Sequence, residues 1–311
     1  MTAVLTGLGL AVAGLHDAGD LLRARPAAGG FDPVTALTGR DLRHKDRASR
    51  LALRAVEPAL LDAGLLGPAY TGPPDATAVV VSSNLGNLDT VCEFADIVAR
   101  DTVTGLSPLG LPHTSSNVIA GWVAIRYGLR GPNVTVCNGP TGGLDALYWA
   151  RNLVAAGRAE IAVVVGVEPD TAVVARLLGE AGARTWLDGA AAVVVESAGH
   201  ARQRGVRPRA VLAGYARAGD LGAAVTAARG MDPAPVGLWL TGDPAVPAGG
   251  AAMDLTTRLG RCEGALGVLQ CAAGVAYLDG GGAGGVLATA GGADRDDAAA
   301  ALLVTGPGAD A

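Results

Sequence analysis

Short runs of β-branched residues, each followed by a segment with helical spacing, are the feature that most limits the fold of this chain. The runs lie at 77–81, 134–136, 161–165, 191–195, 211–212 and 302–304, and helical patterns are clearest at 46–65, 117–127, 142–156 and 264–278. The runs are mostly apolar on both faces, as strands are when helices cover both sides of a sheet. This alternation predicts an α/β fold.

The composition agrees with one large domain or two fused halves. The chain has 311 residues, of which 50% are apolar and 17% charged, so it can bury a full core. Its 47 glycines favour tight turns and closely packed elements. The glycine- and alanine-rich run at 280–292 predicts a flexible loop beside a short strand.

The charge pattern argues against several classes of partner. The formal net charge is −5 at pH 7, and no long basic run offers a surface to nucleic acid or to an anionic membrane. No stretch reads as a membrane span, and the first 20 residues lack the basic start of a secretory signal. We therefore expect a cytoplasmic protein with neither nucleic-acid nor membrane partners.

The cysteines and histidines do not predict a metal site. Neither type is spaced like a set of zinc ligands; the residues are Cys92, Cys137, Cys262, Cys271, His16, His44, His113 and His200. In a reducing cytosol the thiols are expected to be free and mostly buried. We expect no metal and no cofactor.

Two helices of small residues suggest an internal repeat. The segments CNGPTGGLDALYWARNLV and GRCEGALGVLQCAAGVAYL each begin with a glycine-containing turn and continue as a nearly all-apolar helix, about 120 residues apart. Helices that are apolar on almost every side lie at the centre of a protein. The similarity of the two segments therefore predicts two related halves packed around these helices.

The ordered series of motifs resembles the β-ketoacyl synthases of fatty-acid and polyketide assembly. The motifs are VVVSSNLGNLDT, SPLGLPHTSSNVIAGWVAIRYGLRGPNVTV, the elbow CNGPTGGLDA, AEIAVVVGVEP and GRCEGALGVLQCAAGVAYL. The resemblance implies a thiolase-like α/β fold, with two related halves in a five-layer αβαβα sandwich. It implies one domain over residues 1–311, with an N-terminal half at 1–198 and a shortened C-terminal half at 199–311.

The resemblance also implies that the catalytic groups of this family are missing. The cysteine of the family falls at Pro140, its first histidine at Trp239, its second histidine at Arg261 and its usual lysine at Thr256. Proline has no nucleophile, although it fits the first turn of a helix. An indole has no basic lone pair, and arginine remains protonated. We expect no catalytic residue at these four degenerate positions.

Cys137 lies three residues before the lost nucleophile and could be imagined as its replacement. On a strand, three residues span about 10 Å, and an odd shift reverses the face. This reasoning predicts a buried, unreactive thiol at Cys137.

The resemblance assigns further residues to a tunnel for the acyl chain and to a subunit interface. Leu85 and Gly110 match positions that line the tunnel, and a glycine at 110 in place of an aromatic residue is expected to leave space there. The alternatives are a core leucine and a turn glycine after Ser107-Pro108. His113 and Asn117 are also assigned to the tunnel, on a segment expected at the subunit interface, with a polar contact as the alternative for His113. The strand Asn133, Val134, Thr135 and Val136 is expected at the interface, with an interior strand as the alternative.

These inferences favour a silent subunit that resembles the chain length factors of type II polyketide synthases, with some likeness to polyene-forming systems. Its expected partners are an active ketosynthase, in a heterodimer, and an acyl carrier protein held mainly by that ketosynthase. One alternative is a stand-alone acyltransferase or decarboxylase that uses Cys137 or Cys262. Another is a homodimeric scaffold with no role in the tunnel.

Overall fold

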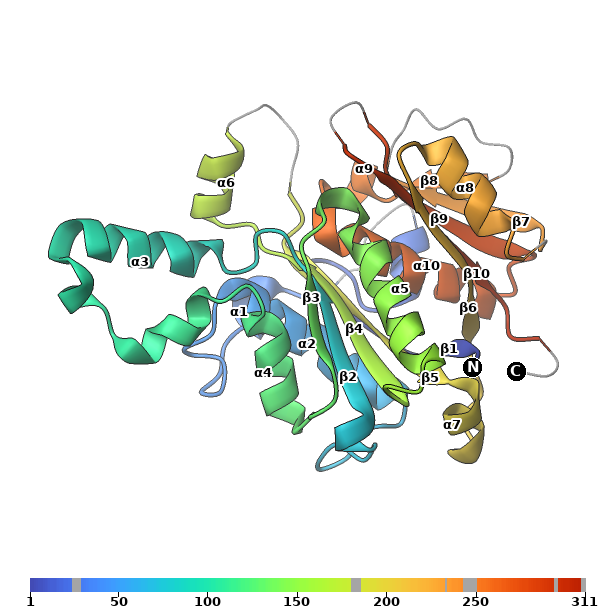
Figure 1. Ribbon diagram of the computed structural model, residues 1–311, viewed down its shortest axis with the longest axis horizontal. Helices are drawn as coiled ribbons and strands as arrows, with labels where there is room; N and C mark the ends of the chain where they lie inside the picture. The colour runs from blue at the N-terminus through green and yellow to red at the C-terminus, as the bar shows by residue number, and fades with distance from the viewer. Residues whose placement is uncertain (24–28, 180–185, 233, 243–250, 294–295, 309–311) are drawn as a thin grey trace.

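The computed structural model describes residues 1–23, 29–179, 186–232, 234–242, 251–293 and 296–308. Ten strands form one mixed sheet in the order β3-β2-β4-β5-β1-β6-β10-β9-β7-β8 (Figure 1). The strands are β1 Ala3–Val12, β2 Thr77–Ser82, β3 Asn133–Val136, β4 Ile161–Glu168, β5 Gly189–Ser197, β6 Ala210–Ala218, β7 Val236–Thr241, β8 Ala251–Asp254, β9 Gly285–Gly291 and β10 Ala299–Thr305.

The sheet consists of two sets of five strands that follow the same order. Within β1–β5 the order is 3-2-4-5-1, and within β6–β10 the corresponding strands follow the same order. The strand directions repeat as well: β2 is parallel to β3 and β4, and β7 is parallel to β8 and β9, while the remaining pairs are antiparallel. The two sets meet where Val4 and Leu5 of β1 pair with Val211 and Ala210 of β6.

Helices lie between and outside the two sets of strands. They are α1 Pro33–Ala36, α2 Arg47–Asp62, α3 Leu88–Asp101, α4 Val118–Tyr127, α5 Gly142–Ala155, α6 Ala172–Leu178, α7 Ala198–Gln203, α8 Leu221–Arg229, α9 Thr256–Leu259 and α10 Leu266–Asp279. The central core contains α5 and α10 with strands of both sets. Helices α2 and α4 cover the outer face of the first set, and α8 covers that of the second. The result is five layers.

The central helices touch because glycine stands where they meet. A Cβ on Gly143 would lie 2.7 Å from the backbone nitrogen of Gly267, and one on Gly267 would lie 2.3 Å from that of Leu144. Real side chains do not tolerate such distances, so larger residues would force the helices apart. The small-residue pattern in the sequence is thus explained by close helix packing.

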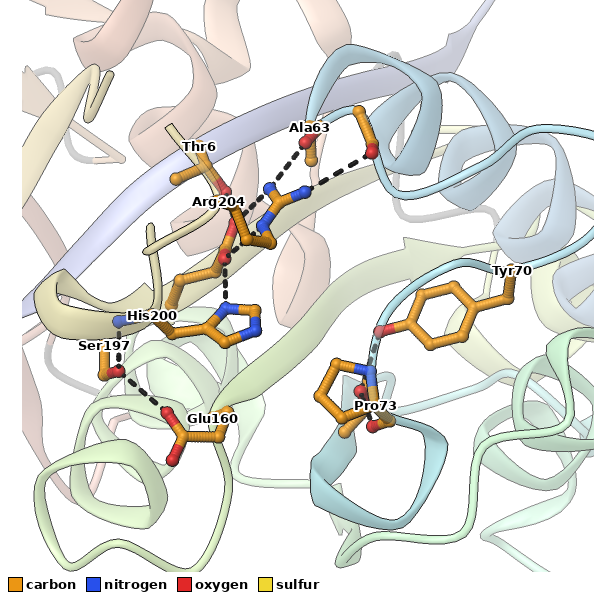
Figure 2. A network of polar contacts seen from close by, with 11 residues as sticks. Thr6, Ala63, Tyr70, Pro73, Glu160, Ser197, His200 and Arg204 are labelled. Atoms are coloured by element: carbon orange, nitrogen blue, oxygen red, sulfur yellow. Dashed lines mark hydrogen bonds and ion pairs between the residues drawn. The ribbon is translucent and has the colours of Figure 1, made fainter. Parts of the chain in front are cut away.

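A polar network closes the end of the first set of strands (Figure 2). The Glu196 carboxylate of β5 is fully buried and accepts hydrogen bonds from Thr6 Oγ1 at 2.5 Å and Arg204 Nη2 at 2.9 Å, while His200 Nδ1 lies 2.7 Å away. Arg204 Nη2 also donates to the carbonyl of Ala63, just beyond α2. One guanidinium therefore joins α2 to the sheet.

A long segment between β2 and α4 extends away from the two sets of strands. We call residues 85–117 the arm; it contains α3 and two short 3₁₀ segments, Val103–Gly105 and Pro108–Thr114. No residue of α3 is buried, and Figure 1 shows α3 extending away from the rest of the molecule. Among the described residues α3 is held by few contacts, one of which is the hydrogen bond from Thr171 Oγ1, just before α6 Ala172–Leu178, to Asp89 Oδ1 at 2.7 Å.

The four helices predicted from the sequence are all found, whereas several strands have no counterpart in the prediction. Helices α2, α4, α5 and α10 lie where periodicity predicts them. Strands β1, β7 and β8 have no corresponding run in the prediction, and β9 occupies part of the 280–292 segment expected to be mainly loop. These strands are rich in Gly, Ala and Leu rather than in β-branched residues, so the sheet around them decides their conformation.

Candidate functional site

The site is built around the turn that opens α5. Strand β3 ends at Val136, residues 139–141 form a 3₁₀ turn, and α5 begins at Gly142. Gly139 has φ +63°, a conformation that favours glycine. Pro140 follows it at the start of the turn, where its missing N–H costs no helical hydrogen bond. The elbow therefore has the form expected from the sequence, with no reactive group at its tip.

Two polar side chains hold the elbow in place. The Asn84 amide donates to the Gly139 carbonyl at 3.1 Å and accepts from the Gly139 N–H at 3.1 Å. The buried Asp145 carboxylate accepts from Thr141 Oγ1 and from Asn138 Nδ2, each at 2.9 Å, and from the Tyr215 hydroxyl. The elbow is thus rigid although it carries no nucleophile.

The turn before α10 lies against the elbow. A Cβ on Gly142 would lie 3.8 Å from the Cα of Gly264, which belongs to the turn Glu263–Ala265. Arg261, just before this turn, donates from Nε to Glu263 Oε1 at 2.9 Å and stacks on the Trp186 ring at 4.5 Å. Its charge is paired, and a guanidinium does not exchange protons near neutral pH.

Glu168, at the end of β4, joins these two turns. Its carboxylate accepts the N–H of Asn84 at 2.7 Å, of Leu85 at 3.2 Å and of Gly264 at 3.1 Å. Burial raises the pKa of Glu168 to about 7, against the opposing effect of the three N–H donors. Sequence reasoning missed this residue, although a polar residue that ends the apolar run IAVVVGVE was a visible signal.

Trp239 does not join the cluster around the elbow. Its indole Nε1 donates to Thr289 Oγ1 of β9 at 2.9 Å, and its ring packs with the outer core under α8. The neighbouring Leu240 faces the central core instead. Trp239 therefore faces away from the elbow, because alternate residues of a strand face opposite sides. Its match to the first histidine of the family stays a prediction.

Thr256 is held by its own turn. It begins α9, and both its N–H and its Oγ1 donate to Asp254 Oδ1 at 2.7 Å. The hydroxyl is thus used in a local turn rather than offered to a substrate.

The thiols of the site are not activated. Cys137 is exposed, so the prediction that it is buried was wrong: the chain turns out of the sheet directly after Val136. Partial desolvation and the nearby Glu168 raise the pKa of Cys137. Burial raises the pKa of the Cys262 thiol, and it raises the pKa of the Cys271 thiol to about 12. None of these three has the lowered pKa of a nucleophilic cysteine.

The residues expected in a tunnel lie at the two ends of the arm. Leu85 is half-buried beside Glu168. A Cβ on Gly110 would lie 2.6 Å from the ring of Phe94 in α3, so the space expected at this glycine is already filled. The His113 ring stands edge-on to Trp122 of α4 at 5.5 Å, and the exposed Asn117 accepts from Ser115 Oγ at 2.5 Å. The sequence did not single out Phe94.

Strand β3 is one of the two edge strands of the sheet, and β8 is the other. It pairs with β2 through Asn133, Val134, Thr135 and Val136, and its other edge has no strand beside it among the described residues. Burial rises along it, from the exposed Asn133 to the buried Val136. The edge is therefore open to a strand from another chain.

Two negative findings concern only the described ranges. No helix there is both long and apolar enough to cross a membrane. No group of three or more potential ligand side chains there could hold a metal ion.

The sequence of this chain is similar to proteins of one known family. Residues 19–201 match the family model for the N-terminal domain of beta-ketoacyl synthases. A 3-oxoacyl-(acyl-carrier-protein) synthase 2 of Vibrio harveyi is 29% identical over 217 residues, covering 61% of this chain and 51% of that protein. The chain thus spans about half the length of the curated relatives it matches.

Two solved structures match the whole chain. The ishigamide ketosynthase/chain length factor has a TM-score of 0.77 at 26% identity, and covers 99% of this chain and 100% of its own. A beta-ketoacyl synthase from Burkholderia phymatum has a TM-score of 0.78 at 16% identity, with 99% and 100% covered. Together with the family match they confirm the expected thiolase-like fold: the chain belongs to the beta-ketoacyl synthase family.

Proposed function

We propose that this chain is a catalytically silent chain length factor, which pairs with an active ketosynthase and shapes the tunnel that receives the growing acyl chain. The observation that carries the proposal is the elbow: its turn, glycine and polar supports are all present, while Pro140 stands at its tip. Covalent acyl transfer requires an activated nucleophile, and proline supplies none. The contour of the site is therefore kept without its reactivity.

The open surfaces support a partner subunit. The edge of β3 can accept a strand, and the arm carries apolar side chains that contact little of this chain: Val91, Val98, Val103, Leu109 and Leu111. The side chain of Leu109 is the most exposed of these, at 87%. Obligate partners bury large apolar areas, on the order of 2,000 Å² or more. We propose that the arm and β3 together form the interface with the ketosynthase, and that the ketosynthase holds most of the acyl carrier protein.

The oligomeric state of the purified chain tests this proposal. We expect the chain alone to aggregate or self-associate, because these apolar surfaces lack a cover. Co-expression with a ketosynthase that retains its cysteine and both histidines is expected to give a 1:1 complex by size-exclusion chromatography with light scattering. A chain that stays a stable monomer in both preparations would contradict the heterodimer.

A thiol-dependent acyltransferase or decarboxylase is the second candidate, and the exposure of Cys137 favours it. The raised pKa of this thiol argues against it. Labelling with iodoacetamide at pH 7 distinguishes the two: fast stoichiometric modification of Cys137, lost together with activity in Cys137→Ser, would support the enzyme. Modification no faster than that of a free cysteine supports the silent subunit.

A further inference from the structure

A hollow opens between α5 and β6, beside the elbow. It has a volume of about 460 Å³ and is lined by residues of α5, of β6 and of the loop after α8, with Asn138 of the elbow in its wall. Tyr148 of α5 and Tyr215 of β6 stack there with their ring centroids 4.2 Å apart. Trp149 and Met231 also line the hollow and are 48% and 56% exposed. The hollow therefore presents large apolar side chains to solvent.

Three polar side chains that line the hollow are turned to a fourth, the buried Asp145. The Tyr215 hydroxyl and Asn138 Nδ2 donate to the Asp145 carboxylate, and Arg217 Nε lies 4.0 Å from it. Because polar groups that are already paired gain little from a new partner, the binding surface that remains consists of ring faces and a thioether. This surface fits a bulky apolar side chain.

The exposed side of α5 continues the open edge of β3. The chain runs from β3 through the exposed Cys137 directly to Asn138 in the wall of the hollow. Val134 of β3 and Tyr148 of α5 are both half-buried against the same central core, and Figure 1 shows α5 beside β3. A subunit that adds a strand at this edge therefore lies next to the hollow as well.

The length of the edge also requires a wider contact. Strand β3 has four residues, which span about 13 Å. An obligate interface buries on the order of 2,000 Å² or more, and aromatic side chains near its centre supply much of the binding free energy. Trp149 is half exposed beside a hollow and close to an open strand edge, and these are the properties of such a side chain.

We propose that Trp149 is the anchor of the contact with the ketosynthase subunit, and that the hollow beside it receives one aromatic or other bulky apolar side chain of that subunit. The assignment rests on the proposed function, because the ketosynthase is the partner that it names. The occupant packs on the Tyr148–Tyr215 pair, and the Tyr215 hydroxyl is bound to the carboxylate that also accepts from Thr141 of the elbow. The partner is thus seated against the network that holds the elbow.

The affinity of the complex with a ketosynthase subunit tests the anchor. We compare wild type, Trp149→Ser and the control Leu61→Ser, which changes a side chain of similar exposure, 54%, near the end of α2. The dissociation constant is expected to rise at least about tenfold for Trp149→Ser and less than about twofold for Leu61→Ser. Equal dissociation constants for the two variants would overturn the anchor.

The chemistry of the occupant is tested at Met231. Met231→Glu and Met231→Lys should both weaken the complex, because either charge loses water when an apolar side chain covers it. Weakening by one charge and strengthening by the other would show that a charged group is recognised, and the stated chemistry would be wrong. The same two variants replace Trp149→Ser if that protein does not fold, since Met231 is 56% exposed.

Oxidation by peroxide tests coverage of the hollow in the unmodified proteins. Met253 lies on β8, at the edge of the sheet opposite β3, and is the reference. Formation of methionine sulfoxide at Met231 is expected to be at least about tenfold slower in the complex than in the chain alone, with Met253 unchanged. A complex in which Met231 reacts at its former rate would overturn this inference and leave the proposed function intact. If no complex forms, the proposed function fails, and the assignment of the hollow fails with it.

Discussion

Individual residues decide whether the site can react. Pro140 supplies no nucleophile and fits the turn, because the turn is held by Asn84 and Asp145 and needs no N–H at position 140. The Arg261 guanidinium is paired with Glu263 of the same turn. The one group in the cluster with a pKa near neutrality is Glu168, which contacts backbone rather than a substrate position.

Glu168 predicts how the free energy of unfolding depends on pH. Its folded-state pKa, about 7, lies above the usual 4.5, so its contribution is complete below pH 4.5 and is lost as the pH rises to 7. Wild type should therefore lose up to about 3 kcal/mol relative to Glu168→Gln between pH 4.5 and pH 8. Urea unfolding followed by circular dichroism checks this; parallel pH profiles for the two proteins would show that Glu168 does not titrate there.

Single elements are joined by a few directed contacts. Arg204, at the end of α7, binds Glu196 of β5 and the carbonyls just after α2, so one side chain serves three elements (Figure 2). The arm is the opposite case, because α3 has no buried residue and is held by few contacts, such as the hydrogen bond from Thr171 to Asp89. Arg204 is therefore expected to matter for stability, whereas the arm is the surface that we propose for a partner.

Removing the Arg204 guanidinium should destabilise the chain strongly. Arg204→Met removes the guanidinium from the fully buried Glu196 and leaves it with Thr6 and His200, and breaking a buried ion pair costs about 3–5 kcal/mol. The exposed Arg207 on the same loop gives the matched control, Arg207→Met, for which we expect less than about 0.5 kcal/mol. Denaturant midpoints at constant slope measure both. Similar midpoints for the two variants would refute a structural role for the network.

Polar substitutions on the arm should weaken pairing without unfolding the chain. Leu109→Ser changes a side chain that is 87% exposed, so the melting temperature of the chain should change little. Its affinity for a ketosynthase subunit should fall about tenfold or more if Leu109 is buried at the interface. Leu177→Ser, on the exposed face of α6, is the control. Equal affinities for both variants, measured by calorimetry, would place the interface elsewhere.

At the scale of the whole molecule, two similar sets of strands and helices meet along α5 and α10. The meeting depends on glycine at 143 and 267, where backbone touches backbone. It also depends on the short pairing between β1 and β6, which makes one sheet of both sets. The elbow and the α10 turn face each other only because these contacts bring the halves together.

A side chain at the central contact should therefore disturb the whole fold. Gly267→Ala would place a methyl group 2.3 Å from the backbone nitrogen of Leu144, and we expect a loss of about 2 kcal/mol or more. Gly199→Ala, in α7, has no atom within 4 Å of the new methyl group and serves as the control, with little change expected. Thermal unfolding of both variants measures the difference; a Gly267→Ala protein as stable as wild type would mean that the helices can separate at no cost.

The sequence by itself determined the α/β class, the central helices and the proline at the tip of the elbow, because periodicity and residue identity are local properties. It reached Pro140 and the resemblance to β-ketoacyl synthases, but it placed Cys137 in the interior. Only the tertiary structure decided the exposure of Cys137 and the side of the sheet that Trp239 faces, since the face of a strand residue depends on register and on where the strand ends. The same holds for Glu168 and Phe94: their roles arise from Asn84, Gly264 and Gly110, which are far away in sequence or separated by a turn, and such contacts exist only when the chain is folded.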